Sequence, residues 1–171
     1  MNSGVALKFG GRLQGNNEWL TPPDFIAALG HFDLDPCSPV DRPWNTATNH
    51  FSLRENGLVK PWYGRVWLNP PFGHEIPAWM RHMSEHGNGI ALCMARTETA
   101  WFQEYIFNSP NMSALLFLRK RLTFYNANGR LALSNCGGAP VLVAYGECNA
   151  AALVRSSFKG FYIRRGAGLC W

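Results

Sequence analysis

The chain has 171 residues, of which 47% are hydrophobic and 16% are charged, and its formal net charge at pH 7 is +5. This composition is ordinary for one compact domain, and at this length such a domain needs neither disulfides nor a metal ion to stay folded. Because no apolar run reaches the roughly 18 to 20 residues of a membrane span, and residues 1–11 lack the apolar core of a signal peptide, we expect a soluble intracellular protein with no membrane partner.

The first part of the chain predicts a loose arm, a short helix and a short strand. Residues 1–17 are rich in Gly and Asn and are expected to form a flexible arm. A helix over residues 21–30 is indicated by Thr21 as its cap, prolines in its first turn and Gly30 at its end. A strand over residues 31–35 follows. Residues 37–64 show no sustained period, so we expect an ordered connection, whose length indicates a functional segment or a missed element.

The rest of the chain alternates apolar strands with amphipathic helices. We expect strands over residues 65–69, 89–94, 113–118 and 141–145, helices over residues 76–86 and 99–107, and a hairpin of residues 121–126 and 130–134. This alternation predicts one α/β domain over residues 18–171, with a mostly parallel sheet covered on both faces, in which the last strands can run antiparallel. Ligands bind at the carboxyl ends of such strands. Two strands end there in polar sequences, Asp33-Leu34-Asp35-Pro36-Cys37-Ser38 and Asn69-Pro70-Pro71-Phe72.

The basic residues are concentrated in the last third of the chain. Residues 119–171 contain eight Lys or Arg and one acidic residue, a net charge of +7, whereas residues 1–118 sum to −2. Arginines outnumber lysines twelve to four, and the planar guanidinium suits phosphates and guanine edges. The pattern favours a polyanionic partner, most simply nucleic acid. The alternative is a generic basic surface that aids solubility.

The cysteines and histidines do not predict a metal site. Five cysteines are an odd number with no C-x-x-C pair, so free thiols are expected. His82 and His86 would share a helix face, and a zinc site with His74 or Cys93 is the alternative that this spacing offers. No second spaced pair completes four ligands, and we therefore expect no bound metal.

The Asn-Pro-Pro-Phe sequence suits the binding of a planar aromatic amine. Two successive prolines stiffen the end of the strand and remove two N–H donors. The amide oxygen of Asn69 and the carbonyl of Pro70 can both accept hydrogen bonds from one NH2 group, while Phe72 offers a face for stacking. Such contacts localise the lone pair of the amine and stabilise the positive charge that grows as it attacks an electrophile. The alternative is a turn that only ends the strand.

These residues also carry a resemblance. Leu68-Asn69-Pro70-Pro71-Phe72 resembles the (D/N/S)PP(Y/F) motif of the S-adenosylmethionine-dependent amino-methyltransferases. The wider pattern is similar to the phage and prophage Dam-like DNA adenine-N6 methyltransferase family. The matching segments, in family order, are residues 19–22, 32–38, 57–58, 62–73, 95–97, 101–102 and 121–124. The resemblance implies a Rossmann-like methyltransferase fold with a basic hairpin insertion, acting in the cytoplasm of a bacterial host cell.

The resemblance also implies roles for individual residues. The catalytic residues are Asn69, Pro70, Pro71 and Phe72. S-adenosylmethionine, with S-adenosylhomocysteine as product, is expected to contact Trp19, Thr21, Pro22, Asp35, Pro36, Cys37, Ser38 and Asn69. In this scheme Asp35 accepts from the α-ammonium group, and the hydroxyls of Thr21 and Ser38 serve the carboxylate.

Double-stranded DNA is the implied partner. An adenine inside the duplex must be rotated out of the stack to reach Asn69. Phe72 is the expected stacking surface, and Trp101 is a second candidate or a core residue. The residues expected to contact DNA are Arg96, Trp101, Arg119, Lys120, Arg121 and Arg130. The alternative for the basic residues of the hairpin is a solvated turn.

The sequence departs from the family pattern at three places. Cys37-Ser38-Pro39 stands where most methyltransferases have a Gly-rich turn. Only 33 residues separate Asp35 from Asn69, so the strand whose acid holds the ribose is shortened or lost. Asp41, Asn45 and Glu55 are weak candidates for that contact. Lys120 occupies a position where the family pattern has glycine.

Several alternatives stay open at this point. Cytosine-N4 methylation uses the same chemistry, and a non-catalytic DNA-binding protein would agree with the missing glycines. Methylation of glutamine or of guanine in ribosomal RNA is disfavoured because those enzymes are expected to keep the Gly-rich turn. GATC is the family-based recognition sequence, with relaxed specificity as the alternative, since no separate recognition domain fits this length.

Overall fold

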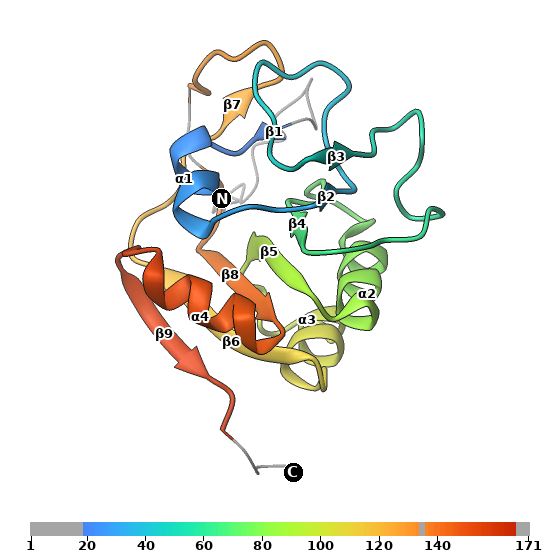
Figure 1. Cartoon of the computed structure of the whole chain (residues 1–171). Coiled ribbons are helices and arrows are strands. Elements are labelled where there is room, and N and C mark those ends of the chain that lie inside the picture. Colours follow the sequence, from blue (N-terminus) through green and yellow to red (C-terminus); the bar gives the residue numbers. More distant parts are fainter. Residues whose placement is uncertain (1–18, 134–135, 167–171) are drawn as a thin grey trace, which may run out of the picture.

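The computed structural model describes residues 19–133 and 136–166, so the expected arm at residues 1–17 lies outside the described residues. The elements in chain order are β1 (Trp19–Leu20), α1 (Pro23–Leu29), β2 (Leu34–Asp35), β3 (Asn49–His50), β4 (Val66–Leu68), α2 (Ile76–His86), β5 (Gly89–Met94), α3 (Ala100–Phe102), η1 (Gln103–Phe107), β6 (Met112–Leu118), β7 (Tyr125–Asn126), β8 (Pro140–Tyr145), α4 (Glu147–Arg155) and β9 (Gly160–Arg164) (Figure 1).

Seven of the strands form one mixed sheet in the order β3-β2-β4-β5-β8-β6-β9. The first four strands in this order are mutually parallel. Strand β8 runs antiparallel to both β5 and β6, and β9 runs antiparallel to β6. The antiparallel pairings are the longest, so the expectation of a mostly parallel sheet is not confirmed. The physical reason is that residues 119–139 contain no described crossover helix between β6 and β8, and a chain that returns without one pairs antiparallel.

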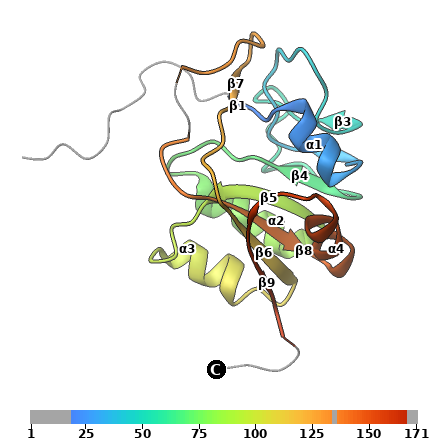
Figure 2. The same cartoon turned by 90° about the vertical axis from the view of Figure 1, so that its left-hand side faces the viewer.

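Helices cover both faces of the sheet, as the sequence predicted (Figure 2). On one face α1 and α4 bury Phe25, Ile26 and Leu153 against strand residues such as Trp67. On the other face the apolar sides of α2 and α3 pack against the alternate strand residues, which are Val66, Leu68, Ala91, Cys93, Leu115, Val141 and Val143. Because successive side chains of a strand point to opposite faces, the unbroken apolar runs of β5 and β8 supply both cores.

The predicted elements with clear end signals are confirmed. Helix α2 and strand β5 have the predicted bounds, and Gly87 ends α2 in the left-handed conformation at φ 72°. Helix α1 begins one residue later than a cap at Thr21 would place it, because Pro22 occupies the capping position, and no side chain caps the helix. The helix expected over residues 99–107 is present as α3, which continues into the π-helical turn η1.

The predicted hairpin is present in a short form. Across the turn at Gly129, Tyr125 forms an antiparallel bridge to Leu131, and the backbone N–H groups of Asn126 and Ala132 donate to the carbonyls of Arg130 and Phe124, both at 2.9 Å. Strand β7 also pairs with β1, so that Leu20 lies opposite Tyr125. The hairpin therefore has a distant partner that its local pattern did not indicate. Strand β3, helix α4 and strand β9 were not predicted.

Candidate active site

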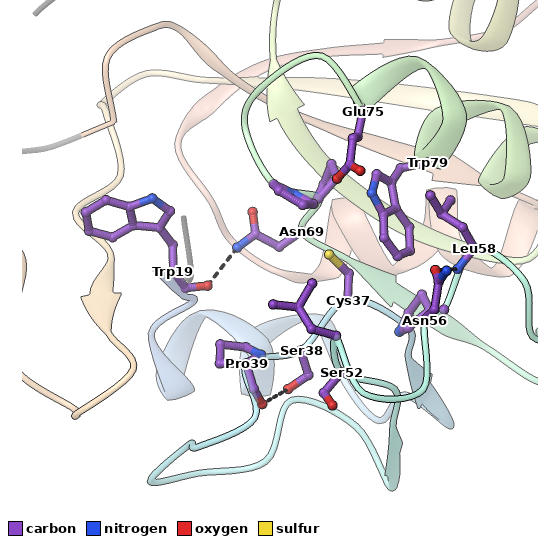
Figure 3. Close-up of a pocket in the computed structure, with 15 residues that line it drawn as sticks. Trp19, Cys37, Ser38, Pro39, Ser52, Asn56, Leu58, Asn69, Glu75 and Trp79 are labelled. Atoms are coloured by element: carbon purple, nitrogen blue, oxygen red, sulfur yellow. Dashed lines mark hydrogen bonds between the residues drawn. The ribbon is translucent and has the colours of Figure 1, made fainter. Parts of the chain in front are cut away.

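The two polar sequences lie side by side in the structure. Strands β2 and β4 are neighbours and parallel, so their carboxyl ends meet at the same edge of the sheet. Together they line a cavity of about 340 Å³ (Figure 3). The residues that sequence reasoning assigned and that line this cavity are Trp19, Pro36, Cys37, Ser38, Asn69, Pro70 and Pro71. The structure therefore joins three segments that are separated by more than a dozen residues in the chain.

Asp35 shapes one wall of the cavity from behind. Its Oδ1 accepts a hydrogen bond from the backbone N–H of Cys37 at 3.0 Å, and its Oδ2 accepts one from the hydroxyl of Thr46. Burial raises the pKa of Asp35 to about 6, in spite of these hydrogen bonds. The side chain is not among those that line the cavity, and it fixes the turn of residues 36–38 that does. Its contact with a cofactor stays a prediction.

Thr21 and Pro22 have structural contacts of their own. The carbonyl of Thr21 accepts a hydrogen bond from the indole of Trp44 at 3.0 Å, and the Thr21 side chain is buried. Pro22 precedes α1 and accepts the first hydrogen bonds of that helix through its carbonyl. Neither residue lines the cavity.

Asn69 presents a free acceptor at the edge of the cavity. It follows β4 directly, and its side-chain Nδ2 donates to the carbonyl of Trp19 at 3.2 Å (Figure 3). Its Oδ1 is buried and has no hydrogen-bond partner among the described residues. A buried acceptor without a partner costs free energy and is rare in folded proteins. The fixed Nδ2 leaves Oδ1 available to a ligand that carries an N–H group.

An aromatic group lies next to Asn69. The rings of Trp19 and Phe72 pack against Phe124, with centroid distances of 6.5 and 5.9 Å. Phe72 is half-buried and does not line the cavity. Trp19 borders both the cavity and this aromatic group. Stacking of a base on Phe72 stays a prediction.

The cavity has walls that sequence reasoning did not assign. The segment after β3 contributes Ser52, Leu53, Asn56 and Leu58, and the start of α2 contributes Glu75 and Trp79. The unusual length of residues 37–64 was the signal for the first group. Gly57 is required in this segment, because a Cβ there would lie 1.9 Å from the carbonyl oxygen of Pro36. A role for Trp79 in the cavity could not be predicted from the sequence, because its position fits the apolar stripe of a helix.

The three candidates for the ribose contact do not line the cavity. Asp41 and Asn45 border a separate open depression beside Asn128. Glu55 accepts hydrogen bonds from the backbone N–H and the hydroxyl of Ser52, at 2.8 and 2.6 Å. Between β2 and β4 the described residues contain one strand, the two-residue β3.

Most of the predicted DNA-contacting residues lie at the same edge of the sheet as Asn69. Arg96 follows β5, is exposed and forms an ion pair with Glu98 at 3.4 Å. Residues 119–121 follow β6, which has the same direction as β4 and β5, and all three side chains are exposed. Arg130 is exposed beyond β7. Trp101 is half-buried against Phe102 and packs on the core beneath α3, as the core alternative described.

Metal ligands are not gathered in the described residues. No three His, Cys, Asp or Glu residues of the described ranges lie close enough to hold an ion, and His82 stacks flat on Trp62 at 4.4 Å. The thiols of Cys37, Cys93, Cys136 and Cys148 are free. Within residues 19–133 and 136–166, no helix has the length and apolar character needed to cross a bilayer.

Comparison with known proteins identifies the family. The sequence pattern of a family described as DNA N-6-adenine-methyltransferase (Dam) matches residues 13–154. No curated protein and no solved structure matches the chain. The matched range includes the strand ends at residues 35–38 and 69–72, and it covers most of the 171 residues. The chain belongs to the Dam family of DNA N-6-adenine methyltransferases.

Proposed function

We propose that this chain transfers the methyl group of S-adenosylmethionine to N6 of an adenine that is flipped out of double-stranded DNA. The observation that carries the proposal is the buried, unpartnered Oδ1 of Asn69 beside a cavity of about 340 Å³. A volume of this order suits a small-molecule site. The family supplies the reaction class, and the free acceptor supplies a place for the amine.

The chemistry asked of Asn69 is positioning and charge stabilisation. The lone pair of an exocyclic amine is delocalised into the ring, so the amine is a weak nucleophile. Acceptance of its hydrogens by Asn69 Oδ1 and the Pro70 carbonyl localises that lone pair and stabilises the charge that develops on nitrogen. S-adenosylmethionine supplies a methyl group on a sulfonium: the N–C bond forms, the C–S bond breaks with its electron pair on sulfur, and the amine then loses a proton to solvent.

The cavity walls suit the methyl donor. Trp19 and the residues 36–38 would hold it next to Asn69, and Asp35 would keep the turn in shape through its bond to Cys37. Thr21 and Pro22 would support this wall from behind. In this proposal the domain of residues 18–171 is Rossmann-like, because β2, β4 and β5 are parallel and the site lies at their carboxyl ends.

The DNA would approach the same edge of the sheet. Trp19 and Phe72, which both pack against the buried Phe124, would offer aromatic faces next to Asn69 for the flipped adenine. The exposed cations at Arg96, at residues 119–121 and at Arg130 would bind the distorted phosphate backbone. GATC or a relaxed sequence is the proposed target.

Product analysis tests the proposal. The protein is incubated with S-adenosylmethionine and unmethylated duplexes with and without GATC, and the DNA is digested to nucleosides for mass analysis. N6-methyladenosine in its deoxy form is the expected product, and the two duplexes separate GATC from relaxed specificity. Detection of N4-methylcytosine instead would show that cytosine, and not adenine, accepts the methyl group. Absence of any methylated base, together with absence of thermal stabilisation by S-adenosylhomocysteine, would leave a DNA-binding protein.

A further inference from the structure

Two polar groups at the start of α2 have no role in the chemistry described above. Trp79 is 6% exposed and lines the cavity, and its indole N–H is buried with no hydrogen-bond partner among the described residues. The indole nitrogen is a donor only, and an acceptor on a molecule bound in the cavity would satisfy it. In Figure 3 the nitrogen-bearing edge of the indole lies on the side of Glu75.

Glu75 is the one carboxylate among the residues that line the cavity, and no Lys, Arg or His is among them. It occupies the N-cap of α2, and its carbonyl accepts the backbone N–H of Trp79 at 3.3 Å. The two residues are therefore one helical turn apart and share a face of the helix. Burial raises the pKa of the Cys37 thiol, and the negative charges of Asp35 and then of Glu75 raise it further.

The pair presents an acceptor and a donor side by side. A ligand that satisfies both must offer a donor next to an acceptor. The methionine end also offers a donor, its α-ammonium group, but the carboxylate beside that group would be repelled by Glu75. The adenosine part of the cofactor has two such edges, the N6 and N1 atoms of the base and the hydroxyls of the ribose.

We propose that Glu75 and Trp79 bind the adenosine part of S-adenosylmethionine, with the Glu75 carboxylate as acceptor and the Trp79 indole N–H as donor. This inference rests on the proposed function and assigns the acid that the shortened β3 does not supply. Asp41, Asn45 and Glu55 lie outside the cavity, whereas Glu75 enters it from the helix that follows the Asn-Pro-Pro-Phe sequence.

The test measures cofactor binding separately from methyl transfer. Affinities for S-adenosylmethionine and S-adenosylhomocysteine are measured by calorimetry for the wild type, Glu75→Gln, Trp79→Phe and the control Glu85→Gln, which makes the same change on an exposed position of the same helix. We expect Glu75→Gln to weaken both ligands about tenfold and Trp79→Phe to weaken both about threefold to tenfold. Glu85→Gln should bind as the wild type does.

Two analogues identify the edge that is bound. S-inosylhomocysteine reverses the donor and acceptor at the base edge, and the 2′-deoxyribose analogue removes one hydroxyl. If the pair binds the base, the wild type discriminates against the inosine analogue and Glu75→Gln does not. If the pair binds the ribose, the wild type discriminates against the 2′-deoxyribose analogue and Glu75→Gln does not.

The outcomes separate this inference from the proposed function. Unchanged affinities in Glu75→Gln and in folded Trp79→Phe would overturn the assignment, while wild-type binding and methyl transfer would leave the function intact. A loss confined to the cationic S-adenosylmethionine would also overturn it, because Glu75 would then act on the sulfonium charge. Wild-type protein that binds neither ligand would instead contradict the proposed function.

Discussion

Asp35 and His50 are expected to give opposite pH dependences to the stability of the fold. They are register partners on β2 and β3. Burial raises the pKa of Asp35 from 3.8 to about 6, so between these values the folded state holds a proton that the unfolded state has released. The free energy of unfolding therefore falls as pH rises through this window. The shift corresponds to about 3 kcal/mol, since one pKa unit is about 1.4 kcal/mol.

Burial acts on His50 in the other direction. It lowers the pKa of His50 from 6.5 to about 4, and the ring Nε2 accepts from the backbone N–H groups of Thr46 and Ala47, both at 3.3 Å. Between these pKa values the unfolded state binds the extra proton, so stability rises with pH. Because His50 is only half-buried, solvent screening reduces its contribution, which therefore offsets that of Asp35 only in part. The unfolding free energy of the wild type should fall between pH 4 and 6 by less than the Asp35 contribution alone.

Two conservative variants separate the contributions. Asp35→Asn keeps an oxygen for the Cys37 N–H and should show a rise in stability from pH 4 to 6. His50→Gln keeps an acceptor for the Thr46 N–H and should show a fall of up to about 3 kcal/mol. Urea unfolding at a series of pH values measures both. Profiles of Asp35→Asn and wild type that run parallel would refute the reasoning.

Three further changes test the site, the DNA surface and the fold. Asn69→Ala should lower the single-turnover rate of methyl transfer at least about a hundredfold, because the acceptor is lost, while Asn69→Asp keeps an oxygen and most of the rate. Neutralising residues 119–121 together should reduce the slope of log affinity against log salt by up to about 2.7, at about 0.9 for each phosphate contact. Arg65→Lys should lower the free energy of unfolding by about 2 to 3 kcal/mol, because the guanidinium donates to Asn149 at 2.6 Å and to the Leu29 carbonyl at 3.0 Å, and half-burial limits the effect.

Each of these expectations has a contrary result. Equal rates of methyl transfer for Asn69→Ala and the wild type would show that the Asn69 amide has no part in the reaction. An unchanged salt slope would place residues 119–121 away from the DNA. If urea unfolding gives Arg65→Lys the same free energy of unfolding as the wild type, the lysine ammonium group is as stabilising there as the several hydrogen bonds of the guanidinium.

The sequence predicted best those features that depend on local signals. Helix α2 and β5 were found because apolar periodicity and Gly87 define their limits. Strand β3 was missed because Asn49 and His50 carry no apolar pattern and become a strand only by pairing with β2. Helix α4 was missed because much of its buried side consists of small residues and Asn149.

The same distinction applies to the site. The ends of β2 and β4 could be assigned because their polar sequences interrupt buried strands, and parallel neighbours bring such ends together. Glu75 and Trp79 could not be assigned in this way. Trp79 fits the apolar stripe of α2, and only the packed structure reveals that its N–H is unpartnered at a cavity.

The most direct test of the account is a crystal structure of the protein with S-adenosylhomocysteine and a duplex that contains the target adenine. The measured quantity is the distance between Asn69 Oδ1 and N6 of that adenine. We expect a hydrogen bond of about 3 Å, with the adenine out of the stack and the thioether in the cavity beside Cys37. An adenine bound away from Asn69, or a cofactor bound outside this cavity, would contradict the account.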